Sequence, residues 1–403
     1  MFAHRTKDLS LSQTVDMNTR AAQLNADANP VISLAAGEPD WPTPPAICKS
    51  AIRALRQGKT RYSEPAGILP LRKKIVSSLQ HKYQLSYETN EITITSGAKQ
   101  AIFNAFMATL NHSDEVIIPA PYWSSFVEIT KLCEADPIIV PCPQQQNFKL
   151  QPLQLENAIS KKTKWLILNS PCNPTGSLYH QDELKELAKI LLKHPHIRIL
   201  SDDIYTDFIY PPNVFYNIVQ VEPRLKKQTL IVNGFSKSYA MTGWRIGYCA
   251  GDQHLIKAMI NLQSHSTTAV NSFVQWAAIE ALELGETFTQ ENIQKLKTRL
   301  NLVIKTCNNI GYLECFVPEG AFYAYINCQA LIGAQTPSKK IITCDSDLAF
   351  YLLEYAKISC VPGKAFGLEP YLRISYAVSL EQLKTAMKRM EQALQQLQLN
   401  TPL

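Results

Sequence analysis

The stretch EITITSGAKQAIFNAFMATL, residues 91–110, contains a complete strand–turn–helix unit. Residues 91–95 are rich in β-branched side chains, which favour a strand, and the small residues 96–98 favour a tight turn. From Lys99 to Leu110 the apolar residues recur at helical spacing. A strand that leads through a turn into an amphipathic helix is the repeating unit of a mostly parallel sheet covered by helices, so the stretch predicts an α/β fold.

The same pattern continues on the C-terminal side of this unit. Short apolar runs predict further strands at 115–118, 165–168, 197–200 and 229–232. Between the second and third of these runs, residues 182–193 form an amphipathic pattern that predicts a crossover helix between parallel strands.

The C-terminal third has a different character. A long helical pattern covers about 286–309, and short strands are predicted at 321–326, 358–361 and 371–376. A last helix is expected to begin at Ser379, which forms a capping-box pattern with Gln382.

The length of 403 residues exceeds what one hydrophobic core usually supports, so two domains are expected. We predict an N-terminal arm with part of a small domain at 1–45, a large cofactor-binding domain at 46–285, and a small α+β domain at 286–403.

Composition excludes several classes of protein. With 46% hydrophobic and 18% charged residues and a net charge of only +6, the chain fits neither a disordered protein, a membrane protein nor a nucleic-acid-binding protein. The polar start carries no secretory signal, so a cytoplasmic location is expected. The ten cysteines are scattered, with no ligand spacing, and we predict no metal site.

Polar clusters follow the predicted strands, at the sheet edge where ligands bind in such folds. Ser96-Gly97-Ala98-Lys99 could present backbone N–H groups to a phosphate, Asn169–Gly176 forms a rigid loop with an amide at Asn173, and Ser201–Tyr205 places Asp202 at a strand end. Each cluster alone is also a common turn or cap.

The fourth cluster is NGFSKSYAMTGWRIGY, residues 233–248, in which Lys237 shares the segment with one other charge, Arg245. Such surroundings desolvate an amine and lower its pKa, and a neutral amine attacks an aldehyde to give an imine. Together the four clusters supply an amine, a phosphate site, an acid for a pyridine nitrogen, and amide and phenol groups for a phenolate oxygen. This set of groups matches pyridoxal 5'-phosphate.

The order of these motifs resembles that of the class I and II aminotransferases of pyridoxal-phosphate fold type I, and within them the bacterial aspartate and aspartate/prephenate subgroup. The resemblance extends from AAGEPDWPTP (35–44) and GKTRYSEPAG (58–67) to VPGKAFG (361–367) and YLRISYA (371–377). It implies a mostly parallel sheet of the seven-stranded type, sandwiched by helices, and a smaller α+β domain.

The resemblance also implies roles for individual residues. Lys237 would hold the cofactor as a Schiff base and act as the catalytic base, Asp202 would pair with the pyridine nitrogen, and Tyr205 and Asn173 would contact the phenolate oxygen. Trp123 would stack on the ring, while Arg245 and the Ala98 and Lys99 amides would bind the phosphate. Arg373, with Gly37 and Asn173, would bind the substrate α-carboxylate. The alternative for Arg373 is an arginine on an edge strand without a role in binding. Tyr62 would reach the phosphate of a neighbouring subunit, which implies a homodimer with shared active sites.

One position departs from the family pattern. Gly234 stands where many relatives have Ser, which removes a possible phosphate ligand. The second acid, Asp203, stands where Glu is commoner and carries no functional argument.

The expected substrate depends mainly on one position. Lys99 stands where relatives that act on dicarboxylates place a lysine for the distal carboxylate, so aspartate or glutamate with a 2-oxo acid such as 2-oxoglutarate is expected, by a ping-pong mechanism. Ser12 and Thr14 are weaker candidates on a segment that would close over the substrate. Prephenate remains a possible acceptor.

Two other readings remain open. A lyase, an aminocyclopropane-type synthase or an aromatic aminotransferase would keep the cofactor and change the reaction. A regulator that uses this fold as a ligand sensor would need a DNA-binding domain, and only about thirty residues precede the family core.

Overall fold

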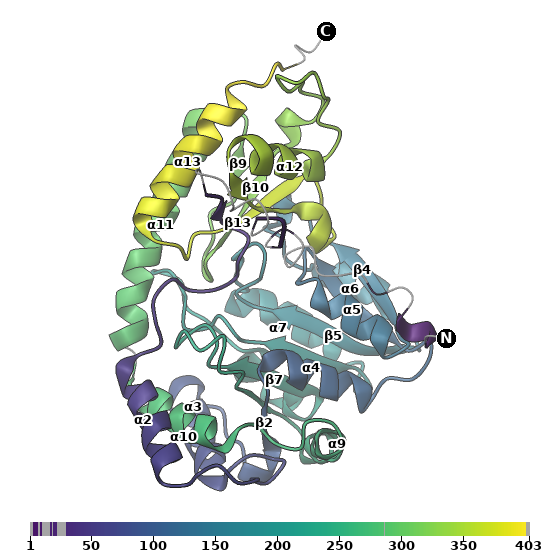
Figure 1. Cartoon of the computed structure of the whole chain (residues 1–403). Coiled ribbons are helices and arrows are strands. Elements are labelled where there is room, and N and C mark those ends of the chain that lie inside the picture. The colour runs from purple at the N-terminus through teal and green to yellow at the C-terminus, as the bar shows by residue number, and fades with distance from the viewer. Residues whose placement is uncertain are drawn as a thin grey trace.

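The computed structural model describes residues 3–6, 9, 17, 19–21, 30–285 and 287–399. At its centre is a seven-stranded sheet of order β2-β8-β7-β6-β5-β3-β4, in which β8 alone runs antiparallel to its neighbours. Its strands are β2 (Ile92–Thr95), β3 (Glu115–Ala120), β4 (Asp136–Pro141), β5 (Thr163–Asn169), β6 (Arg198–Asp202), β7 (Thr229–Gly234) and β8 (Gly247–Ala250). The expected mostly parallel α/β sheet is confirmed (Figure 1).

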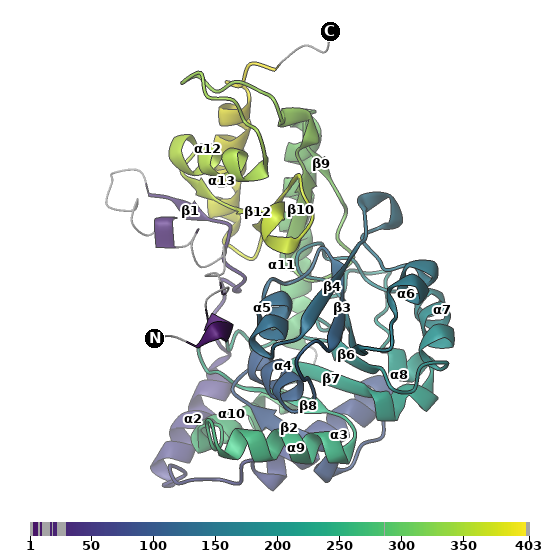
Figure 2. The ribbon, with the colours of Figure 1, turned by 90° about the vertical axis from the view of Figure 1, so that its right-hand side faces the viewer.

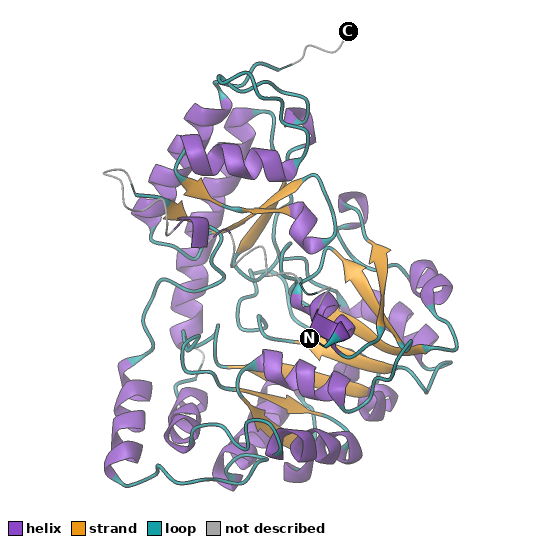
Figure 3. Ribbon diagram, turned by 45° about the vertical axis from the view of Figure 1, so that its right-hand side comes forward, coloured by secondary structure: helices purple, strands orange, loops and turns teal. Residues whose placement is uncertain are grey.

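Helices cover both faces of this sheet (Figure 3). One layer consists of α4 (Ala98–Met107), α5 (Ser125–Leu132) and α9 (Gln253–Ser264). The other consists of α2 (Pro45–Arg56), α3 (Leu69–Tyr83), α6 (Pro152–Ala158), α7 (Gln181–Leu191), α8 (Ile218–Val221) and α10 (Ser272–Glu283). Alternate residues of one strand enter opposite cores: Trp165 and Ile167 face the first layer, and Leu166 and Leu168 the second. Strands buried on both faces explain the continuous apolar runs in the sequence.

A third core belongs to the C-terminal part of the chain, which lies above the large sheet in Figure 2. Its elements are α11 (Thr287–Ile310), β9 (Glu314–Cys315), β10 (Tyr323–Asn327), α12 (Asp345–Tyr355), β11 (Ile358–Ser359), β12 (Val361–Pro362), β13 (Tyr371–Ser375) and α13 (Leu380–Leu394). An antiparallel sheet has the order β12-β13-β10-β9, and β1 (Ile32–Ser33) pairs in parallel with β11. The N-terminal segment therefore packs with the C-terminal elements. The domain limits at 45 and 285 remain predictions.

Short 3-10 helices occur at His4–Thr6, Thr89–Glu91, Gln144–Gln146, Pro223–Gln228, Gln329–Leu331 and Gly363–Phe366. Within the residues that the structure describes, no helix is both long and apolar enough to cross a membrane.

The predicted elements are found with ends shifted by a few residues, with one correction. The strand expected at 358–361 is two strands, β11 and β12, that belong to different sheets and are separated by Cys360. The apolar run is continuous because both short strands are buried, so the hydrophobic pattern contains no sign of the break. At Ser379 the expected helix cap is present, since its hydroxyl accepts the Gln382 N–H at 3.2 Å.

Candidate active site

A pocket of about 300 Å³ opens at the carboxyl ends of the central strands. Its lining residues come from both parts of the molecule: Gly37, Ala98, Lys99, Trp123, Ser125, Asn169, Asn173, Asp202, Ile204, Tyr205, Ser236, Lys237, Thr242, Arg245, Tyr323 and Arg373. Every predicted site residue that the structure describes is in this set except Tyr62. The ends of β5 and β6 and the segment that follows β7 line the pocket, together with Tyr323 of β10 and Arg373 of β13.

Lys237 follows β7 and is half-buried in the pocket. Its Nζ donates a hydrogen bond to the Gly37 carbonyl at 2.6 Å. Burial lowers the pKa of Lys237 to about 8, an effect that Glu38 opposes and that the nearby guanidinium groups of Arg373 and Arg245 reinforce. A larger share of this amine is therefore neutral near pH 7 than for an ordinary lysine, which favours nucleophilic attack and proton transfer.

Asp202 ends β6 and is 4% exposed. Burial raises its pKa to about 7, although the Ile204 N–H, at 3.3 Å, and Lys237 favour the charged form. Among the described residues no cation forms a salt bridge with this carboxylate. A buried acid of this kind gains most from a positively charged partner that enters the pocket.

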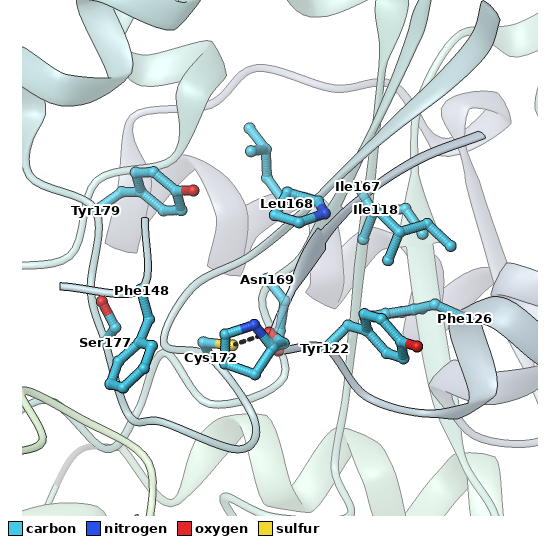
Figure 4. Close-up of a pocket in the computed structure, with 12 residues that line it drawn as sticks. Ile118, Tyr122, Phe126, Phe148, Ile167, Leu168, Asn169, Cys172, Ser177 and Tyr179 are labelled. Atoms are coloured by element: carbon cyan, nitrogen blue, oxygen red, sulfur yellow. Dashed lines mark hydrogen bonds between the residues drawn. The ribbon is translucent and has the colours of Figure 1, made fainter. Parts of the chain in front are cut away.

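Asn169 fixes the loop that carries Asn173, a function that the sequence reasoning missed. Its Nδ2 donates to the Asp202 carbonyl at 3.0 Å, and its Oδ1 accepts the Asn173 N–H at 2.9 Å. Behind this loop lies a second, mainly apolar cavity of about 20 Å³, shown in Figure 4, where the Cys172 thiol donates to the Pro121 carbonyl. That cavity has room for about one water molecule and contains no cation, so it supports the loop and is too small for a substrate.

Arg373 lies on β13, an internal strand of the small sheet, which rules out the edge-strand alternative. It is 2% exposed. Its Nη1 donates to Asn173 Oδ1 at 3.1 Å, and its Nη2 donates to the Ala35 carbonyl at 2.5 Å. Within the described residues its buried Nε has no hydrogen-bond partner. The guanidinium therefore retains unused donors toward an anion.

The start of α4 forms an anion cradle. Among the described residues no hydrogen bond uses the backbone N–H groups of Ala98 and Lys99. Arg245 reaches across this helix start, where a Cβ on Gly97 would lie only 2.7 Å from its Nη2. Gly97 has φ +79°, so it both permits the turn and leaves room for the guanidinium. Backbone donors, the helix dipole and a cation together suit a phosphate.

Lys99 and Trp123 form the mouth of the pocket. The Lys99 ammonium lies 4.8 Å from the centre of the Trp123 ring, a cation–π contact. Burial lowers the pKa of Lys99, and Arg245 lowers it further by repulsion. Two neighbouring positive charges in this part of the pocket favour a ligand that is negatively charged there.

Tyr323 is a second pocket residue that the sequence reasoning missed. Its hydroxyl lies 2.8 Å from that of Tyr205, and its ring lies under the Arg373 guanidinium at 4.6 Å. A tyrosine inside an apolar strand pattern is typical of core packing, so the sequence contains no signal for this position. Ser125, Ile204, Ser236 and Thr242 also line the pocket without having been predicted.

Some predicted positions lie elsewhere. Tyr62 is 94% exposed and lines a separate hollow with Arg61 and Trp276. Ser12 and Thr14 lie outside the described residues. Gly234 does not line the pocket, and a Cβ there would lie 3.1 Å from Gly247 Cα, so a serine would require its neighbours to move.

Comparison with known proteins gives consistent matches over nearly the whole chain. The family model for aminotransferases of class I and II matches residues 29–390. An aspartate aminotransferase of Rhizobium meliloti (strain 1021) is 44% identical over 97% of this chain and 95% of its own length. A probable aspartate/prephenate aminotransferase of Rhizobium leguminosarum bv. phaseoli is 47% identical over 94% of this chain and 95% of its own.

Solved structures match equally well. The crystal structure of the Rhizobium meliloti aspartate aminotransferase superposes with a TM-score of 0.96 at 43% identity, covering 98% of this chain and 99% of that one. The Thermus thermophilus aspartate aminotransferase with maleate gives a TM-score of 0.91 at 34% identity, with the same coverage. Sequence, fold and pocket agree, and the chain belongs to the class I and II aminotransferase family.

Proposed function

We propose that the protein is an aspartate aminotransferase that depends on pyridoxal 5'-phosphate. It would move the amino group of L-aspartate or L-glutamate to a 2-oxo acid such as 2-oxoglutarate in a ping-pong reaction. The observation that carries this proposal is the meeting, in one pocket, of the Lys237 amine, the buried Asp202 carboxyl and the Arg373 guanidinium.

The residues of the pocket fit the cofactor. The Ala98 and Lys99 amides and Arg245 would bind its phosphate, and Asp202 would pair with its ring nitrogen. Because Asn173 Oδ1 already accepts from Arg373, its amide nitrogen is left to donate to the phenolate oxygen. Tyr205 would donate to the same oxygen, and Trp123 would cover a face of the ring.

When bound, the cofactor would supply an aldehyde for exchange of amino groups and a ring that accepts electrons. Asp202 would keep the ring nitrogen protonated. Lys237 would hold the cofactor between turnovers, and its Nζ, once freed by the substrate, would accept the α proton and hold it for return. Arg373 would fix the α-carboxylate with the donors that Asn173 and Ala35 leave free.

Lys99 supports a dicarboxylate as substrate. It lies in the pocket near Arg245, and with that guanidinium bound to the phosphate the Lys99 ammonium remains to meet a distal carboxylate. The names of the similar proteins support aspartate, and those named aspartate/prephenate aminotransferase support prephenate as a second acceptor, which has a distal carboxylate of its own.

A homodimer with shared sites belongs to the same proposal. Tyr62, with 94% of its surface exposed, is accessible to a second subunit. The domain limits at 45 and 285 and the cytoplasmic location also remain proposals.

Absorbance spectroscopy tests the function. The purified protein, supplied with pyridoxal phosphate, is expected to show the band of the lysine-bound cofactor, and Lys237→Ala is expected to lack it. L-Aspartate should convert the band to that of the aminated cofactor, and 2-oxoglutarate, or prephenate, should restore it. A band that aspartate leaves unchanged would contradict the proposed substrate and would favour a lyase or an aromatic specificity.

A further inference from the structure

Tyr323 contacts both the Tyr205 hydroxyl and the Arg373 guanidinium. Its side chain is 1% exposed, its hydroxyl lies 2.8 Å from the Tyr205 hydroxyl, and the Arg373 guanidinium lies 4.6 Å from its ring centre. The fit is close, because a Cβ on Gly37 would lie 2.4 Å from the Tyr323 hydroxyl. Tyr323 therefore joins the group proposed for the phenolate oxygen to the group proposed for the substrate carboxylate.

The two tyrosines have only two hydroxyl protons between them, and this limits what Tyr205 can donate to a ligand. Each phenol carries one proton, and one of the two must lie in the bond between the hydroxyls. If Tyr205 donates to Tyr323, it has no proton left for a ligand. If Tyr323 donates, the Tyr205 proton is free to point into the pocket.

Arg373 favours the second arrangement. Burial raises the pKa of Tyr323, but the nearby guanidinium opposes this rise. Burial raises the pKa of Tyr205 well above its usual value, and its contact with Tyr323 raises it further, whereas Arg373 opposes this rise only as the weakest influence. Tyr323 is thus the more acidic phenol of the pair, and the more acidic hydroxyl is the better donor.

We propose that Tyr323 is a positioning residue that donates its hydroxyl proton to Tyr205 and so directs the Tyr205 proton at the phenolate oxygen of the cofactor. The inference rests on the proposed function. A hydrogen bond from Tyr205 stabilises the negative charge on the phenolate oxygen. That oxygen then attracts less strongly the proton on the nitrogen that joins Lys237 to the cofactor. Loss of the Tyr323 hydroxyl should therefore make that nitrogen more basic.

The test is a pH titration of the absorbance of the cofactor-loaded protein. Tyr323→Phe keeps the ring under Arg373 and removes only the hydroxyl. We expect the midpoint of this titration, which is the pKa of the nitrogen that joins Lys237 to the cofactor, to rise by about 0.5–1 pH unit. A shift of this size corresponds to the free energy of one hydrogen bond between neutral groups. Tyr376→Phe is the matched control, because it removes a hydroxyl from a second buried pair, Tyr210 and Tyr376 at 3.0 Å, outside the pocket. An unchanged midpoint in Tyr323→Phe, or an equal rise in both variants, would overturn the proposal.

A double variant keeps the test decisive if Tyr323→Phe alone is unstable. Removing both hydroxyls leaves no unpaired buried phenol, so Tyr205→Phe/Tyr323→Phe is expected to fold. If Tyr323 acts through Tyr205, this variant and Tyr205→Phe should have the same midpoint. Different midpoints would show an independent effect and refute the relay. Absence of the cofactor band from the wild-type protein would refute the proposed function instead.

Discussion

Asp202 and Asp203 are consecutive, yet their carboxyl groups serve different parts of the molecule. Asp202 lines the pocket, whereas Asp203 accepts hydrogen bonds from Ser201 at 2.7 Å and from Asn217 at 2.7 Å, away from the pocket. Successive side chains at a strand end point in opposite directions, which separates the two acids. The chain thus contains a catalytic candidate and its own matched control.

Asp202→Asn is expected to lower kcat strongly, because an amide cannot hold a positive charge on the ring nitrogen. Removing one partner of a buried charged pair costs about 3–5 kcal/mol, equivalent to about 10²–10⁴-fold in rate. Asp203→Asn should keep kcat near the wild-type value, since Asn can still bond Ser201 and Asn217. Steady-state kinetics of both variants decides the matter, and equal losses in the two would argue against the assignment of Asp202.

The stability of the cofactor-free protein should fall as the pH rises from 5 to 8. Burial raises the pKa of Asp203 to about 8 and that of Asp202 to about 7, from an ordinary value of 3.8. In this pH range the folded state binds more protons than the unfolded state, so the free energy of unfolding decreases with increasing pH. Urea denaturation at several pH values measures this slope. It should be shallower in Asp203→Asn, and a slope of opposite sign would contradict the direction given for these pKa values.

Lys99→Met should weaken the use of dicarboxylates selectively. A hydrogen bond to a charged group contributes about 1.5–3 kcal/mol, so kcat/KM for aspartate should fall about 10–100-fold. The value for a monocarboxylic amino acid such as phenylalanine should change little. Lys131→Met, on α5 but outside the pocket, is the control. A loss shared equally by both amino acids would assign Lys99 to the cofactor site and not to substrate selection.

Tyr62 tests the shared site through subunit mixing. Tyr62→Ala and Lys237→Ala should each be impaired as pure proteins. When the two are unfolded and refolded together, mixed dimers would contain one site with both wild-type side chains, so activity should reappear. Each variant refolded alone provides the control. No recovery, despite mixed dimers detected by mass spectrometry, would show that Tyr62 acts within its own subunit or not at all.

The sequence was most informative where one strong local signal determines structure. Continuous apolar runs followed by small and polar residues located β5, β6 and β7 and, at their ends, Asn173, Asp202 and Lys237. The residues contributed by those strand ends could be grouped because parallel strands bring their carboxyl ends together.

Strands β4 and β8 and the pocket residue Tyr323 are examples of features that could not be predicted in the same way. The edge strand β4 contains Pro137 and Pro141, which disrupt a strand pattern, and the short antiparallel β8 follows directly on a loop rich in functional residues. Tyr323 meets Tyr205 across 118 positions of sequence. Such a contact depends on how the small sheet packs over the large one, which no local pattern encodes.

Covalent trapping of the cofactor tests the central claim most directly. The protein loaded with pyridoxal phosphate would be treated with borohydride, which reduces a carbon–nitrogen double bond to a lysine to a stable single bond. Its peptides would then be mapped by mass spectrometry. We predict a pyridoxyl phosphate group on Lys237 and on no other lysine, Lys99 included. Modification of another lysine in place of Lys237, or none at all in a protein that transfers amino groups, would contradict the account.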